Sequence, residues 1–173
     1  MIHIGLCTDN RYAMPCGVCV TSLFENNKDE EITVHVLEKG LTDENRKKFD
    51  RLAADYGQKI ELIPVDDDIF KGYPTTNQFR LSIYYRFLFA NALPEDVHKL
   101  IYLDCDTLVL DSLRELWNID VTNYSIAAVE DQQGDNVHIF NRLQEIKKYE
   151  STLKSPLSVF KPDNIRLAHN PSC

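Results

Sequence analysis

Residues 100–109 read Leu-Ile-Tyr-Leu-Asp-Cys-Asp-Thr-Leu-Val, an apolar run that stops abruptly at two carboxylates. Short apolar runs are typical of buried strands, and a polar end is typical of a strand that meets a ligand. Along an extended chain, residues two apart point to the same side, so Asp104 and Asp106 can converge on one ligand. Two such carboxylates favour a hard divalent cation, which would in turn hold phosphate oxygens. The alternative interpretation is a strand followed by an acidic turn.

Strands and helices alternate on both sides of this stretch. Apolar and β-branched runs predict further strands over residues 2–6, 32–37, 59–65 and 125–129. Helical spacing predicts helices over residues 15–25, 42–56, 81–92 and 113–117. In the first helix Val18, Leu23 and Phe24 would face inward, and in the second Thr42 is the N-cap and Gly57 closes the helix. This alternation predicts an α/β fold with a mostly parallel sheet and helices on both faces.

Polar residues follow three of the predicted strands. Asp9 ends the first strand, Asp104 ends the strand over residues 100–103, and Asp131 follows the last one. In parallel α/β sheets, ligands bind beyond the carboxyl ends of the strands. We therefore expect these three side chains to lie at one edge of the sheet.

The composition is that of an acidic globular domain. The 173 residues carry a formal net charge of -8, which disfavours a nucleic-acid-binding surface because phosphate neutralisation needs clustered Lys and Arg. No apolar run is long enough to span a bilayer, and no secretory signal precedes the first strand. The five cysteines form no regular framework of pairs, as expected in a reducing compartment. These features predict a cytoplasmic protein.

Two other motifs have structural interpretations. Cys16-Gly-Val-Cys19 resembles a thiol redox motif at a helix start, but small residues one helical turn apart also suit core packing, which we favour. Asp66, Asp67 and Asp68 are interpreted as a solvated acidic loop. The five histidines are scattered, and the six glycines form no phosphate-binding loop.

Asp104-Cys105-Asp106 also resembles the nucleophile motif of haloacid dehalogenase phosphatases, an Asp-x-Asp at a strand end. In those enzymes one residue separates the second aspartate from a threonine, whereas Thr107 follows Asp106 directly. Their motif also lies near the amino terminus. The phosphatase is therefore the less favoured alternative.

Six segments of the chain follow the order of one family's motifs. Cys7-Thr-Asp-Asn-Arg-Tyr-Ala13 is similar to a uridine-binding loop, and residues 102–109 match a metal motif. Residues 34–37, 42–45, 82–86 and 111–117 are similar to a second strand, the helix start after it, a helix that offers an arginine to the donor, and a Leu-Trp patch. The chain thus resembles, over residues 1–131, the family 8 retaining glycosyltransferases, which include bacterial lipopolysaccharide galactosyl- and glucosyltransferases and glycogenin.

This resemblance implies a GT-A type, Rossmann-like fold and a metal-dependent transfer, with retention, of a hexose from UDP-glucose or UDP-galactose to a saccharide acceptor. It implies that Asp104 and Asp106 hold Mn²⁺ or Mg²⁺, and that the protein is cytoplasmic or peripheral at the inner face of the membrane. Asp9 would bond the uracil or ribose, Tyr12 would stack on the base, Arg86 would hold the donor, and Asp131 would bond sugar hydroxyls. The implied donor-binding residues are Cys7, Thr8, Asp9, Tyr12, Arg86, Asp104, Cys105 and Asp131.

Later motifs of the family do not occur in this sequence. There is no Phe-Asn-(Ala/Ser)-Gly-Val strand and no His-x-x-Gly-x-x-Lys-Pro-Trp segment, so the sequence names no catalytic residue. We therefore expect a truncated GT-A fold, with residues 1–131 as the nucleotide-sugar-binding half and residues 132–173 as a polar helical segment and irregular tail. Sheet surface left exposed predicts self-association. The alternative function is a non-catalytic remnant that binds UDP and metal, or a protein partner.

Overall fold

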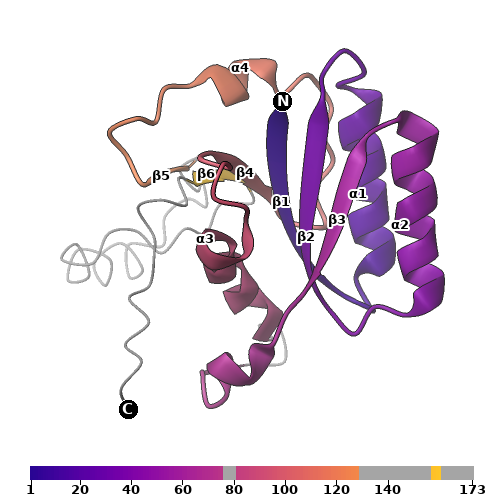
Figure 1. The fold of residues 1–173 in the computed structure, drawn as a ribbon, viewed down its shortest axis with the longest axis vertical. Helices are drawn as coiled ribbons and strands as arrows, with labels where there is room; N and C mark the ends of the chain where they lie inside the picture. Colours follow the sequence, from indigo (N-terminus) through magenta and orange to yellow (C-terminus); the bar gives the residue numbers. More distant parts are fainter. Residues whose placement is uncertain (76–80, 129–156, 161–173) are drawn as a thin grey trace, which may run out of the picture.

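The computed structural model describes residues 1–75, 81–128 and 157–160, and these form a mixed α/β structure around one sheet (Figure 1). The strand order is β3-β2-β1-β4-β6-β5. Neighbouring strands from β3 to β4 are parallel, whereas β6 is antiparallel to both β4 and β5. The strands are β1 (Ile2–Asp9), β2 (Ile32–Lys39), β3 (Lys59–Pro64), β4 (Leu100–Leu103), β5 (Ile126–Ala128) and β6 (Leu157–Phe160).

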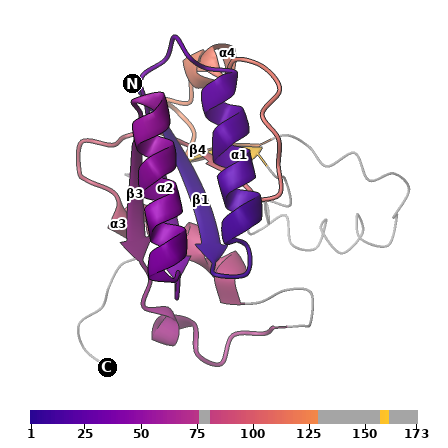
Figure 2. The same cartoon turned by 90° about the vertical axis from the view of Figure 1, so that its right-hand side faces the viewer.

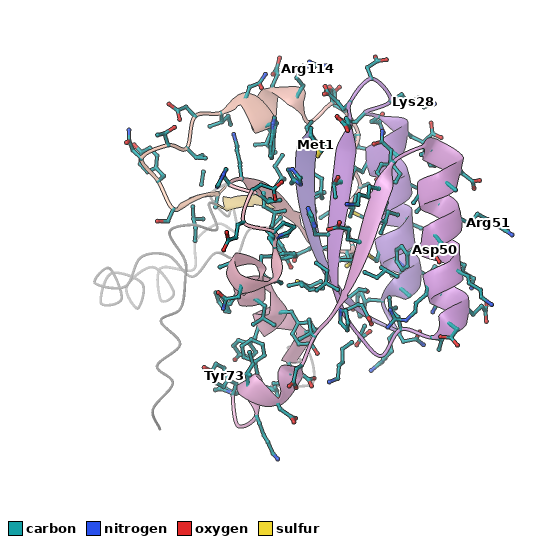
Figure 3. All side chains as sticks on the ribbon, in the orientation of Figure 1. Met1, Lys28, Asp50, Arg51, Tyr73 and Arg114 are labelled. Atoms are coloured by element: carbon teal, nitrogen blue, oxygen red, sulfur yellow. The ribbon has the colours of Figure 1, made fainter. Side chains whose placement is uncertain are left out.

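Helices cover both faces of the sheet, so the predicted fold class is confirmed. In Figures 1 and 2, α1 and α2 lie side by side on one face, and the segment that includes α3 lies on the other. Arg51 of α2 is exposed and points away from the sheet (Figure 3). The helices are α1 (Ala13–Glu25), α2 (Asp43–Tyr56), α3 (Phe89–Ala92), α4 (Arg114–Asn118) and the 3₁₀ helices η1 (Asp67–Phe70) and η2 (Leu81–Leu88).

Each face of the sheet has its own apolar core. Strand residues such as Ile4, Val34 and Ile101 join the core beneath α1 and α2. Their neighbours Leu37 and Leu100 join a second core with Tyr85 and Phe89. Because successive strand residues point to opposite faces, a strand covered on both sides is buried almost throughout. This explains why β2 is buried up to its last residue, its polar residues Thr33, His35 and Glu38 included.

The inward face of α1 differs from the prediction. Val18 is 51% exposed, whereas Cys16 and Cys19 are fully buried beside Leu23. Residues 16, 19, 20 and 23 follow the i, i+3, i+4, i+7 pattern that places side chains on one helix face. The prediction was wrong for Val18 because it weighted the apolar character of valine above this helical phase.

The second helix matches its predicted signals at both ends. Thr42 Oγ1 accepts a hydrogen bond from the backbone N–H of Asn45 at 3.3 Å. Gly57 has φ 63°, in the left-handed region where glycine carries no Cβ penalty. The N-cap and the closing glycine are therefore confirmed.

Two other segments depart from the expected pattern. Residues 81–92 form η2 followed by the single turn of α3. Apolar residues three or four positions apart suit both windings, so their spacing could not distinguish a 3₁₀ helix from an α-helix. Within the expected irregular tail, Leu157–Phe160 form β6 and pair between β4 and β5.

Asp131 and the expected helical stretch after it lie outside the described residues, as does the boundary at residue 131. Within the described ranges, no helix combines the length and apolar character needed to cross a bilayer.

Candidate functional site

Two of the three predicted polar strand ends meet at the carboxyl edge of the sheet. β1 and β4 are parallel neighbours, so the loop after Asp9 and the turn at Asp104 lie at the same edge. A hydrogen bond ties the turn to the end of β1, because Cys105 Sγ donates to the carbonyl oxygen of Cys7 at 3.0 Å. The third strand end, Asp131, lies outside the residues that the structure describes.

The carboxylate of Asp9 shapes the first loop. Its Oδ1 accepts the backbone N–H of Arg11 at 2.8 Å and that of Tyr12 at 3.1 Å. Thr8 is buried and donates its hydroxyl to the carbonyl oxygen of Asp9. Aspartate commonly bends a chain in this way, since its short side chain reaches the N–H groups two and three residues on. The bend leads into α1 and leaves Tyr12 51% exposed at the edge.

Asn10 ties this loop to the start of α2. Its Oδ1 accepts the backbone N–H of Thr42 at 3.0 Å and Nδ2 of Asn45 at 2.9 Å. Local sequence patterns do not indicate this contact, because its partners lie more than thirty residues away. The only local signal was an asparagine beside the expected ligand aspartate.

Asp104 lies at the centre of the second part of the site. Its side chain is 32% exposed, and its Oδ1 accepts the hydroxyl proton of Tyr102 at 2.7 Å. Arg86 Nη2 lies 3.4 Å from the same oxygen, and its guanidinium carbon lies 4.7 Å from the centre of the Tyr102 ring. Burial raises the pKa of Asp104, the hydrogen bond from Tyr102 and the charge of Arg86 lower it, and the charge of Asp106 raises it. Arg86 is thus placed beside the acidic motif.

The chain turns after Asp104, so the reason given for the convergence of the two carboxylates was wrong. β4 ends at Leu103, and both the N–H and the hydroxyl of Thr107 donate to the carbonyl oxygen of Asp104, at 3.2 and 2.7 Å. Residues two apart share a side in a strand but not in a turn. Asp106 is accordingly exposed while Asp104 is half-buried. Carboxylate oxygens suit Mn²⁺ or Mg²⁺, and shared ligation by this pair stays a prediction.

The segment that carries Arg86 is held by polar and aromatic contacts. Tyr85 donates its hydroxyl to Asp67 Oδ2 at 3.0 Å, and Lys39 Nζ lies 2.8 Å from Asp67 Oδ1. The rings of Phe70 and Tyr73 pack 5.5 Å apart, and Tyr73 lies near the lower end of the molecule in Figure 3. These contacts connect η1, η2 and the end of β2 beside the site.

The sequence predicts a solvated acidic loop over residues 66–68. The structure shows that Asp67 is instead paired with Lys39 and hydrogen-bonded to Tyr85. The three carboxylates of residues 66–68 can bring oxygens within 4.8 Å of one another. Asp66 and Asp68 are exposed, and Asp67 is paired with Lys39. Exposed acidic groups of this kind do not by themselves define a cation site.

The four cysteines that the structure describes are buried or partly buried and are unsuited to redox chemistry. Cys7, Cys16, Cys19 and Cys105 are all free thiols. Burial raises the pKa of Cys7 well above its ordinary value and that of Cys19 to about 11, and a hydrogen bond with Cys105 raises that of Cys16. A reactive thiol needs the opposite shift. The packing interpretation of Cys16 and Cys19 is thus supported, and the hydrogen bond from Cys105 to Cys7 ties the turn after β4 to β1.

Comparison with known proteins gives the same assignment. The chain matches the family described as Glycosyl transferase family 8 over residues 3–157. General stress protein A of Bacillus subtilis is 31% identical over 133 residues, which are 76% of this chain and 46% of the relative. Lipopolysaccharide glucosyltransferase WaaO of Escherichia coli is 27% identical over 128 residues, which are 74% of this chain and 38% of the relative.

A solved structure shares the fold. The crystal structure of the galactosyltransferase LgtC in complex with donor and acceptor sugar analogs has a TM-score of 0.77 and 26% identity, over 93% of this chain and 58% of that one. The chain spans less than half the length of the two curated relatives named above. The match over residues 3–157 and the shared fold show that the chain belongs to glycosyl transferase family 8 and has the GT-A fold.

Proposed function

We propose that this chain binds a UDP-hexose, UDP-glucose or UDP-galactose, together with Mn²⁺ or Mg²⁺, for transfer of the sugar with retention to a saccharide acceptor. The observation that carries the proposal is the meeting of two loops at one edge of the sheet. One loop contains Asp9 and the exposed ring of Tyr12, and the other contains Asp104 and Asp106 with Arg86 beside them. Lipopolysaccharide synthesis would place the protein in the cytoplasm or at the inner face of the membrane.

The first loop supplies the nucleoside end of the proposed site. Tyr12 presents an exposed aromatic ring, on which a base can stack. Asp9 uses Oδ1 to hold the loop and, within the described residues, no hydrogen bond reaches its Oδ2. That oxygen is an acceptor suited to a uracil N–H or a ribose hydroxyl.

The second loop supplies the diphosphate end. Asp104 and Asp106 offer the hard oxygen ligands that a divalent cation requires. The bound cation would neutralise charge on the diphosphate and on the departing UDP. Arg86 brings a positive charge to the same place and suits phosphate oxygens because its guanidinium donates in a fork. In the proposal Asp131 bonds sugar hydroxyls.

Calorimetric titration of UDP with and without Mn²⁺ tests the proposal. The wild-type chain should bind UDP more tightly with Mn²⁺, and Asp104→Asn should lose this metal-dependent gain. Loss of an outer-shell partner typically weakens metal binding by about 10–100-fold, so loss of a direct ligand should weaken it at least tenfold. Asp68→Asn is the matched control, since it removes one carboxylate from the other acidic cluster.

Two results would overturn the proposed metal site. The first is a wild-type UDP affinity that is the same with and without Mn²⁺. The second is an Asp104→Asn variant that keeps the full effect of Mn²⁺ on UDP affinity while Asp68→Asn loses it. Release of UDP from UDP-glucose or UDP-galactose then measures transfer to water. Metal-dependent binding without such release would favour the non-catalytic alternative. The two outcomes are distinct because the match covers only 46% of the length of General stress protein A.

A further inference from the structure

Tyr102 combines a buried ring with a hydroxyl that reaches the acidic motif. Its side chain is 3% exposed, and its ring meets that of Phe89 edge-on with centroids 6.2 Å apart. The ring thus belongs to the core between the sheet and the segment over residues 81–92. The hydroxyl emerges from this core and donates to Asp104 Oδ1 at 2.7 Å.

The two parts of this side chain have separable roles. A phenylalanine would fill the same space and would offer Arg86 a similar aromatic face, so packing alone does not call for a hydroxyl. The hydroxyl does fix one oxygen of a carboxylate whose last torsion is otherwise broad. Arg86 lies against the same oxygen. Among the described residues no hydrogen bond reaches Oδ2 of Asp104. That oxygen is therefore the candidate metal ligand.

We propose that Tyr102 is a positioning residue that orients Asp104 for the metal, an inference that rests on the proposed function. Hydrogen bonds to a ligating carboxylate hold it in the geometry that the cation requires. A bond to a charged acceptor is also among the stronger hydrogen bonds in proteins. Tyr102 therefore acts on the cation through Asp104 and makes no contact with it.

Tyr102→Phe separates the hydroxyl from the ring. We expect its Mn²⁺-dependent UDP affinity to fall about tenfold, the lower end of the effect of outer-shell changes. UDP binding without metal should stay close to wild type because the ring and its contacts remain. The thermal midpoint should fall by no more than about 2–4 °C, since loss of one hydrogen bond costs about 1 kcal/mol. Titration of Mn²⁺ alone, followed by its electron paramagnetic resonance signal, should show the same loss.

Tyr56→Phe is the matched control for this change. Tyr56, at the end of α2, also donates its hydroxyl to a carboxylate, that of Glu25 at the end of α1. Its loss should leave the Mn²⁺ dependence within about twofold of wild type. Asp104→Asn combined with Tyr102→Phe should bind no more weakly than Asp104→Asn alone, since Tyr102 acts through that residue.

The outcomes separate the two proposals. If wild-type UDP binding ignores Mn²⁺, the proposed function fails and this inference fails with it. If wild type depends on Mn²⁺ and Tyr102→Phe matches it, the positioning role alone is overturned. Equal weakening with and without metal would show general loosening of the core and would also overturn it.

Discussion

Gly5 lies in β1 where the sheet and the segment over residues 81–92 are in close contact. A Cβ at this position would lie 2.6 Å from Leu100 Cδ2 and 2.8 Å from Phe89 Cζ. Carbon atoms normally pack about 3.5–4.0 Å apart, and both neighbours are buried, so neither can move into solvent. Gly5→Ala should therefore lower the free energy of unfolding by about 1–3 kcal/mol. For a chain of this size each kcal/mol lowers the thermal midpoint by about 2–4 °C.

Urea unfolding followed by circular dichroism measures this change, and Gly17→Ala is its control. Gly17 lies within α1 with no atom within 4 Å of its Cβ position, so alanine there should raise helix stability by up to about 1 kcal/mol. Leu100→Val removes the nearer clashing atom and should partly rescue Gly5→Ala in a double-mutant cycle. A Gly5→Ala variant within about 0.5 kcal/mol of wild type, or an equal loss in Gly17→Ala, would refute the close-approach explanation.

Two further predictions concern titratable groups. His3 Nδ1 lies 3.0 Å from His35 Nε2, and burial lowers the pKa of both side chains. The unfolded chain therefore binds more protons than the folded chain as the pH falls. The free energy of unfolding should decrease as the pH is lowered from 7.5 to 5.5. His35→Gln should show a shallower decline in urea midpoints, and an unchanged slope would contradict the assignment. Burial and raised pKa values should also make the thiols of Cys7, Cys16 and Cys19 slow to react with a disulfide reagent in a Cys173→Ser chain until it unfolds. Rapid modification of the native chain at pH 7.5 would contradict this.

Features set by neighbouring residues were predictable from the sequence. Thr42 and Gly57 terminate α2 through contacts within four residues, and local patterns carry that information. The apolar run of β4 likewise predicted a buried strand. In contrast, β6 pairs with a strand more than fifty residues before it, and nothing local in its sequence indicates that partner. The exposed Val18 shows that even a local pattern fails when its phase is misjudged.

The candidate site shows the same division. The order of motifs predicted that Asp9, Arg86 and Asp104 belong together, and the structure places Arg86 beside Asp104. The hydroxyl of Tyr102 and the amide of Asn10 were missed, because their roles depend on atomic positions that periodicity does not encode. The turn after Leu103 was missed for a related reason. An apolar run indicates that a strand is present but does not define its last residue, and β4 ends at Leu103, before the turn at Asp104.

The acidic character of the chain explains why the proposed site needs a cation. Asp104 and Asp106 follow one strand and Asp9 ends its neighbour, in a chain of net charge -8. Two unit charges about 5 Å apart in a partly buried site repel by about 3 kcal/mol, so a diphosphate approaching these carboxylates meets a substantial barrier. Arg86 supplies one positive charge, but it already lies 3.4 Å from Asp104 and is partly neutralised there. Under the proposed function, a divalent ion held by Asp104 and Asp106 converts a repulsive edge into a binding site. The same carboxylates that would hold the metal thus make UDP binding depend on it.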